Sequence, residues 1–306
     1  MDPLFASAMF ALGLAFGSFL NVCIYRLPRG LSVIHPGSAC PGCEKPIHFY
    51  DNIPVLSWII LHGRCRNCKV RITPRYAIVE LLTGAIFLGC YAYFGLTFAT
   101  LKYCVFGFLL LGLIFTDAET FLLPDKMTLT GLALGLIFSF IVPVNDLASQ
   151  LLPGIVSLPY TQGMWYLLSF ADSLLGAIVG ASFIYGAGAI YLRARGVEGM
   201  GFGDVKLMAM IGAFFGIKLT IFTIFAGSIA GSLFGLWTVL AVWVKRTQRR
   251  IARNHESATQ ARSRAWESAT IALRHHQMPF GVFLGSMAMV AIFFGNQFFR
   301  WYWGLL

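Results

Sequence analysis

The 306-residue sequence is 58% hydrophobic and only 12% charged, with a mean hydropathy of +0.73 and a formal net charge of +10. A soluble domain of this length carries about twice that fraction of charged residues, so the composition excludes an ordinary soluble protein. The apolar residues fall in long blocks, and a block of about 18 or more predicts a transmembrane helix. We therefore predict an all-α polytopic membrane protein.

Eight apolar blocks predict about eight transmembrane helices. In chain order they cover residues 4–24, 78–97, 100–116, 127–144, 170–192, 199–217, 219–244 and 279–299. The first block does not read as a cleavable signal peptide, because its start, MDPLF, has no basic residue and no small-residue cleavage pattern follows. The sixth block needs the glycine-rich residues at its start to approach a hydrocarbon core of ~30 Å, which would place Asp204 inside the helix.

Residues 25–77, between the first two blocks, are predicted to form a small cytoplasmic lobe. The lobe contains the sequences CPGC at 40–43 and CRNC at 65–68. Two Cys-x-x-Cys pairs at this spacing are typical of a tetrahedral structural zinc site, and a metal would stabilise a lobe with so little core. The predicted ligands are Cys40, Cys43, Cys65 and Cys68. Two disulfides or a redox dithiol are the alternatives, although a reducing cytoplasm argues against structural disulfides.

Two further polar segments lie between the apolar blocks. Residues 145–169 are predicted to be an external loop, and residues 245–278 a basic cytoplasmic loop that is helical and lies near anionic lipid. The chain is thus expected to consist of a first helix (1–24), the zinc-binding lobe (25–77) and a seven-helix membrane domain (78–306).

The basic residues predict how the chain is oriented. With the N-terminus outside, 20 of the 23 Lys and Arg residues fall in the cytoplasmic segments, as the positive-inside rule requires. Both termini are then expected outside, in the periplasm. Because these residues flank helices, the positive charge reads as an orientation signal, and we expect membrane lipid but no nucleic acid as a partner.

A few acidic side chains occur at membrane depth or at its edge, where a charge costs about 2.5–3.5 kcal/mol at a helix centre. They are Glu80, Asp117, Asp125, Asp172 and Asp204. Glu80 and Asp172 begin spans and are expected to be interfacial or paired with arginine. Asp117 ends the third span and Asp204 begins the sixth, so both lie at the same depth on the cytoplasmic face. If those two helices pack together, their carboxyl groups can meet.

Such a pair of aspartates suits peptide hydrolysis. Two carboxyl groups at hydrogen-bonding distance in a low dielectric cannot both ionise, so the pair holds one proton. The ionised member can take a proton from water while the protonated member polarises a peptide carbonyl. The spacing alone also fits helix packing or ion transport. The main alternative is therefore a proton- or ion-coupled transporter with a zinc-stabilised lobe.

Several segments together resemble the bacterial type IV prepilin peptidases. They are FGSFLNVCIYRLPRG (16–30), CPGCEKPIHFYDNIPVLSWIILHGRCRNC (40–68), RYAIVELLTG (75–84), DAETFLLPDKMTL (117–129) and GMGFGDVKLMAMIGAFFG (199–216). They occur in the order of that family and cover most of the chain.

The resemblance implies an aspartic endopeptidase of the Gly-x-Gly-Asp type in the bacterial inner membrane. Such enzymes cut the basic leader from type IV prepilins or type II secretion pseudopilins after a glycine. Most then N-methylate the new terminal residue, commonly phenylalanine, with S-adenosylmethionine. The resemblance places the catalytic aspartates at Asp117, with Asp125 as the fallback, and at Asp204, and the zinc ligands at the four cysteines. No cofactor motif locates S-adenosylmethionine.

Overall fold

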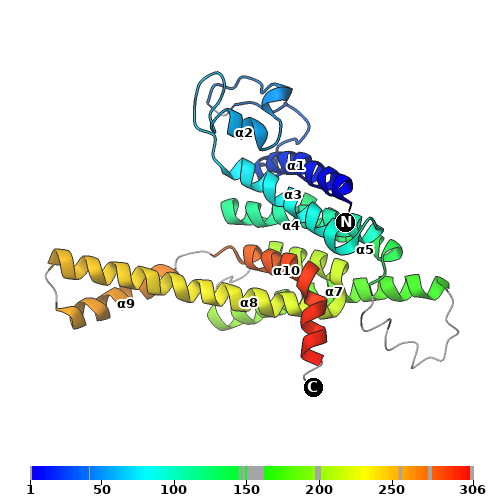
Figure 1. Ribbon diagram of the computed structural model, residues 1–306. Helices are drawn as coiled ribbons and strands as arrows, with labels where there is room; N and C mark the ends of the chain where they lie inside the picture. The colour runs from blue at the N-terminus through cyan, green and yellow to red at the C-terminus, as the bar shows by residue number, and fades with distance from the viewer. Residues whose placement is uncertain are drawn as a thin grey trace.

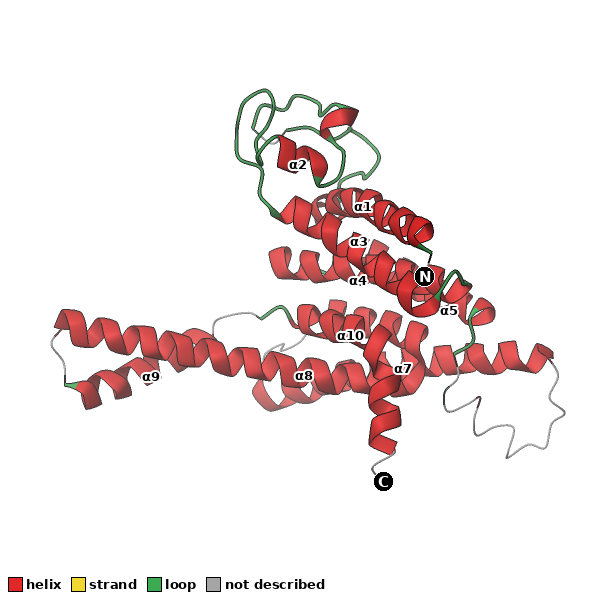
Figure 2. Ribbon diagram, viewed as in Figure 1, coloured by secondary structure: helices red, strands yellow, loops and turns green. Residues whose placement is uncertain are grey.

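The structure is a bundle of long helices with a small loop-rich lobe at one end. The computed structural model describes residues 2–40, 42–144, 146, 149, 162–196, 201–254, 257–274 and 278–303. Within these residues the chain forms helices and loops and no strand, apart from two isolated β-bridges in the lobe (Figure 2). The predicted all-α fold is confirmed.

Seven long helices build the bundle. They are α1 (Pro3–Arg26), α3 (Arg75–Phe94), α4 (Phe98–Thr120), α5 (Asp125–Ile141), α7 (Gln162–Arg195), α8 (Phe202–Asn254) and α10 (Phe280–Trp303). The lobe between α1 and α3 holds the short helix α2 (Leu56–Ile60), and α9 (Ala258–Arg274) packs on the end of α8 (Figure 1). All of these except α2, α5 and α9 are long and apolar enough to cross a membrane, which makes six helices. The predicted count of eight spans is not confirmed.

The difference from eight arises at α5 and α8. α5 has only 17 residues, and α8 is interrupted at Gly216, which has φ 78° and ψ −172°. Gly180 of α7 lies against Met208 on one side of this break and against Thr220 on the other. In a straight helix those two residues would be about 18 Å apart, so the chain must reverse direction at Gly216. The two segments of α8 correspond to the sixth and seventh predicted blocks.

Glycines set the closest helix contacts, as in other membrane bundles, where small residues let backbones approach. A Cβ atom at Gly13 of α1 would lie 2.7 Å from the Cα of Gly84 in α3, and one at Gly17 would lie 2.6 Å from the Cα of Glu80. α1 and α3 are therefore antiparallel partners along their whole length. This contact fixes the depth of each α1 residue relative to α3.

The centre of the bundle is filled by side chains of α4 and the first segment of α8. The rings of Phe106 and Phe214 stack with centroids 4.3 Å apart, and Leu110, Met210 and Ile211 are fully buried beside them. Because a side chain in this position has no lipid contact, its packing stabilises the pairing of these two helices. The core thus holds together the two elements that carry Asp117 and Asp204.

Two predicted boundaries shift in the structure. α4 continues to Thr120, four residues beyond the predicted end at 116, so Asp117 lies within its last turn. α8 begins at Phe202, after the first glycines of the sixth block, so Asp204 lies in its first turn. The basic segment after residue 245 is helical in its described part, as expected, whereas most of the predicted external loop at 145–169 lies outside the described residues.

Candidate active site and metal centre

Asp117 and Asp204 meet at the lobe end of the bundle. Asp117 is 5% exposed and Asp204 is 8% exposed. The left-handed residue Phe121 ends α4 one turn after Asp117 and donates its N–H to the Asp117 carbonyl at 3.0 Å. Gly203 lets the start of α8 approach the loop after α4, because a Cβ there would lie 3.0 Å from the Cβ of Leu123. These two helix ends bring the carboxyl groups to one site.

The start of α10 completes the site. The position that a Cβ of Gly281 would occupy lies 2.8 Å from Oδ2 of Asp117 and 3.3 Å from Oδ1 of Asp204. The N–H of Val282 donates to Oδ2 of Asp117 at 2.9 Å. The N-terminus of α10, which begins at Phe280, therefore points its unpaired N–H groups and the positive end of its dipole at the two acids.

Gly281 and Val282 were missed in the sequence. The signal was present, because Pro279-Phe280-Gly281 begins the last apolar block, and proline near the first turn is typical of a helix start. Nothing in the sequence says that this helix start faces Asp117 and Asp204, since that depends on how α10 packs against α4.

Asp125, the fallback for the first catalytic position, has a different environment. Its side chain is 59% exposed, and its Oδ1 pairs with Nζ of Lys206 at 2.6 Å. Lys206 also lies over the ring of Phe202, 5.1 Å from its centroid. The ion pair joins the start of α5 to the start of α8. The structure thus brings Asp117, and not Asp125, against Asp204.

Glu80 and Asp172, which were expected to be interfacial or paired with arginine, both accept backbone N–H groups. Glu80 is buried, and its Oε2 accepts the N–H of Val55 at 2.7 Å. Asp172 is fully buried, and its Oδ2 accepts the N–H groups of Asp146 and Ser149 at 3.1 and 3.0 Å. Both acids are held by backbone donors of loops that pack against the bundle, because buried N–H groups in such a place need an acceptor.

The four lobe cysteines form a compact cluster that fits a metal ion. Their Sγ atoms lie within 4.8 Å of one another. The two Cys-x-x-Cys turns have the same hydrogen bonds: Cys40 accepts from Glu44 and donates to the Lys45 carbonyl, and Cys65 does the same with Lys69 and Val70. Four sulfur ligands from two matched turns suit tetrahedral zinc, and none of the four places is left for water.

Each turn also contains one strained residue. Glu44 and Lys69 both follow their first cysteine by four positions, and both have positive φ angles of 56° and 60°. A non-glycine residue in this region costs on the order of 1–3 kcal/mol and persists where its surroundings require it. The repeated strain is consistent with turns shaped to direct two thiolates at one point.

The thiols differ in how readily they lose a proton. Hydrogen bonds from the N–H groups of Cys68 and Asn67 lower the pKa of Cys65 to about 6. For Cys68 the N–H of Val70 acts in the same direction, but burial and the neighbouring thiols raise its pKa to about 11. A bound divalent cation would favour the thiolate form of all four cysteines and displace their protons.

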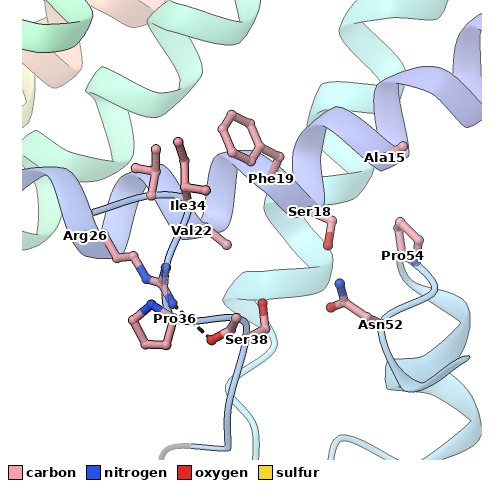
Figure 3. Close-up of a pocket in the computed structure, with 12 residues that line it drawn as sticks. Ala15, Ser18, Phe19, Val22, Arg26, Ile34, Pro36, Ser38, Asn52 and Pro54 are labelled. Atoms are coloured by element: carbon pink, nitrogen blue, oxygen red, sulfur yellow. Dashed lines mark hydrogen bonds between the residues drawn. The ribbon is translucent and has the colours of Figure 1, made fainter. Parts of the chain in front are cut away.

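A pocket of about 410 Å³ lies between α1 and the lobe (Figure 3). Its polar side is formed by Ser18, Arg26, Ser38 and Asn52, and its apolar side includes Phe19. The guanidinium group of Arg26 donates to the carbonyls of Ser32 and Gly37 at 3.0 and 3.2 Å, which holds the lobe loop against α1.

Two family models match this chain. Residues 11–94 match the bacterial peptidase A24 N-terminal domain, and residues 104–236 match the type IV leader peptidase family. The first match contains most of α1, the lobe and α3, and the second contains both aspartates. No solved structure matches the chain.

Three curated relatives share the name prepilin leader peptidase/N-methyltransferase. The Aeromonas hydrophila protein is 30% identical over 323 residues, which cover 98% of this chain and 94% of that protein. The Neisseria gonorrhoeae protein is 35% identical, over 76% of this chain and 81% of its own length. The Myxococcus xanthus protein is 36% identical, over 78% of this chain and 64% of its own length.

These matches agree with the resemblance seen in the sequence and with a multi-helix protein of the bacterial inner membrane. They favour a peptidase over the transporter that the acidic residues alone left open. The chain therefore belongs to the type IV leader peptidase family.

Proposed function

We propose that this protein cleaves the leader peptide from type IV prepilins or type II secretion pseudopilins and N-methylates the new N-terminal residue. The observation that carries the proposal is the meeting of two buried carboxyl groups, from the end of α4 and the start of α8, at the glycine that begins α10. The site lies at the lobe end of the bundle, where a polar leader and an apolar substrate helix would join. An acidic pair also suits a basic leader.

We assign the base to Asp117 and the acid to Asp204. The Val282 N–H that Asp117 accepts stabilises a carboxylate, so Asp117 is the member that takes a proton from the attacking water. Asp204 donates its proton to the carbonyl oxygen of the scissile bond as the water oxygen bonds to the carbonyl carbon. When the C–N bond breaks, Asp117 passes its proton to the leaving amine and Asp204 regains a proton from the tetrahedral intermediate.

We propose that the four cysteines hold a structural zinc ion. Cys40→Ser should abolish stoichiometric zinc in the purified protein, and it should lower the temperature at which the lobe unfolds, because zinc binding supplies much of the folding free energy of so small a unit. Cys104→Ser, in the apolar core, is the matched control and should keep its zinc. Wild-type protein without zinc after purification in metal-replete buffer would contradict the four-thiolate site.

The pocket between α1 and the lobe suits S-adenosylmethionine as the methyl donor. Its volume of about 410 Å³ is in the range of cofactor pockets. Arg26 would pair with the carboxylate of the cofactor, and Ser18 and Asn52 would bind its hydroxyl groups. When bound, the cofactor supplies the methyl group, and the chain's own part is to hold it beside the lobe.

The experiment uses purified protein, a synthetic prepilin and S-adenosylmethionine with a radioactive methyl group. Wild-type protein should shorten the prepilin and label the product. Asp117→Asn should abolish cleavage, whereas Asp125→Asn should retain it to within about tenfold, because an exposed ion pair contributes little. The opposite result, with Asp125 essential and Asp117 dispensable, would overturn the assignment of the base.

A further inference from the structure

The short helix α2 exposes its apolar face. Leu56, Ile59 and Ile60 are spaced at i, i+3 and i+4, so they share one face, and they are 57%, 56% and 68% exposed. Ser57 faces the other way and is buried, where it donates to the carbonyl of Tyr50. A surface helix in water has the opposite arrangement, with its apolar stripe facing the core.

The pocket between α1 and the lobe has polar side chains among its apolar lining. Ser18 and Asn52 face one another across the pocket, with Arg26 and Ser38 toward its other end (Figure 3). This part of the lobe therefore exposes apolar groups of α2, whereas Asn52 and Ser38 face the pocket. This is the arrangement of a protein part that lies in lipid, where polar side chains face an internal cavity and apolar side chains face acyl chains.

The contacts of the lobe also place it beside the spans and not beyond them. Val55 donates to Glu80, which lies five residues inside α3, or about 7 Å along its axis. Pro54 lines the pocket together with Ala15 and Ser18, which lie well inside α1.

The same depth is reached by the candidate catalytic pair. Arg75, the first residue of α3, pairs with Glu119 at 2.9 Å, so Asp117 is level with the first turn of α3. Asn21 of α1 donates to the carbonyl of Tyr76 at 3.0 Å, which puts Asn21 at this level too. The loop that precedes α2 donates to Glu80, one turn further into the membrane than Tyr76, and it lines a pocket with α1 residues on the membrane side of Asn21. It is therefore at least as deep as Asp117.

We propose that residues 53–60 are immersed in the lipid leaflet on the lobe's side of the membrane. Ile53, Leu56, Ile59 and Ile60 contact acyl chains there. The exposed basic residues of the Cys-x-x-Cys turns, among them Arg64 and Lys69, face the headgroups and water. Immersion goes beyond the proposed function, but it bears on it, because it holds the lobe at the depth where cleavage would produce the new N-terminus.

The experiment measures depth directly and needs no activity. A fluorescent amino acid replaces Ile60, or Lys69 as the matched control, in full-length protein in lipid nanodiscs, which leave both membrane faces open to solution. Position 60 should be quenched several-fold more by spin-labelled acyl chains than by iodide, and position 69 should show the reverse. Zinc content and melting temperature show whether each labelled protein is folded. If the protein labelled at Ile60 does not fold, the label is placed at Leu56, on the same face.

Two results would overturn the proposal. If iodide quenches position 60 as strongly as position 69, the loop lies in water. If neither quencher reaches position 60, a protein surface covers the face, such as a second copy of this chain. A failure of immersion leaves the peptidase assignment intact, because the cleavage assay of the aspartate variants is independent of it.

Discussion

Two pairs of buried aspartates occupy opposite ends of the bundle, and they differ in what surrounds them. Asp146 and Asp172 are turned toward backbone donors: Asp172 accepts two loop N–H groups, and Oδ2 of Asp146 accepts the N–H of Lys218 at 2.8 Å. Asp117 and Asp204 face a common point at Gly281. Burial of a carboxyl group in a membrane protein is thus not by itself a sign of chemistry. The distinction lies in whether oxygens of both acids converge on one point, as those of Asp117 and Asp204 do at Gly281.

The first pair has a clear structural task. The chain reverses at Gly216, and the second segment of α8 starts with N–H groups that have no partner in the helix. Asp146 accepts one of them from Lys218, and Lys218 Nζ lies 3.6 Å from its other oxygen. Asp146 therefore caps the second segment of α8, which begins directly at the chain reversal, with no loop between the two segments.

The largest expected difference between the pairs comes from removing one acid of each. Asp204→Ala should lower cleavage by about 10³-fold or more with little change in melting temperature, because it removes an acid–base group. Asp172→Ala should lower the melting temperature, because it removes an acceptor shared by the buried N–H groups of Asp146 and Ser149, and the loss of a buried acceptor costs about 1–3 kcal/mol. Cleavage per folded molecule and thermal unfolding in detergent measure the two effects. Loss of cleavage in Asp172→Ala at an unchanged melting temperature would contradict the assignment of a purely structural role to Asp172.

A smaller effect is expected from filling the space between the catalytic acids. Gly281→Ala places a Cβ 2.8 Å from Oδ2 of Asp117, so the carboxyl group must move. A displacement of this size should lower cleavage by about 10–100-fold, because misplacement by about 1 Å has such an effect on a catalytic group. Gly186→Ala, on α7, is the matched control, since nothing lies within 4 Å of its Cβ position. Equal activity of the two variants would mean that α10 does not shape the site.

The smallest effect concerns the reversal at the other end. Gly216 and Gly95 have φ angles of 78° and 68° with ψ near ±180°, a region that costs other residues about 1–3 kcal/mol. Gly95→Ala, with open space around its Cβ, should show that cost alone. Gly216→Ala adds a clash at 2.7 Å with Oδ2 of Asp146 and should unfold at a lower temperature than Gly95→Ala. If the two variants have the same melting temperature, the contact with Asp146 does not stabilise the chain reversal at Gly216.

Much of this arrangement was predictable from the sequence, because hydropathy and basic residues act over whole segments. The apolar blocks predicted where the long helices lie, and the position of Asp117 and Asp204 at matching ends of their blocks predicted a shared depth. The paired Cys-x-x-Cys motifs predicted the thiol cluster, since the motif itself builds each turn. The end of α4 and the start of α8 were predicted less accurately, because polar residues at a helix end can continue it or stop it.

The remaining features depend on contacts between segments far apart in the chain. Gly281 and Asp117 are 164 positions apart, and only the packing of α10 on α4 joins them. Glu80 was expected to be interfacial or paired with arginine, and it accepts the Val55 N–H because the lobe folds back against α3. The lobe was expected in the cytoplasm as a whole, and composition could not reveal that α2 turns its apolar face outward.

The Arg75–Glu119 ion pair has a mechanical consequence. Arg75 is the first residue of α3 after the lobe, and Glu119 follows Asp117 by two positions in α4. The ion pair connects the start of α3, which follows the lobe with its cysteines, to the turn of α4 that carries the candidate catalytic acid Asp117. A tilt of the lobe would therefore either displace the last turn of α4 or separate Arg75 from Glu119. A movement of the lobe would therefore reach the turn of Asp117 through this guanidinium–carboxylate contact, which acts beside the Val55–Glu80 hydrogen bond.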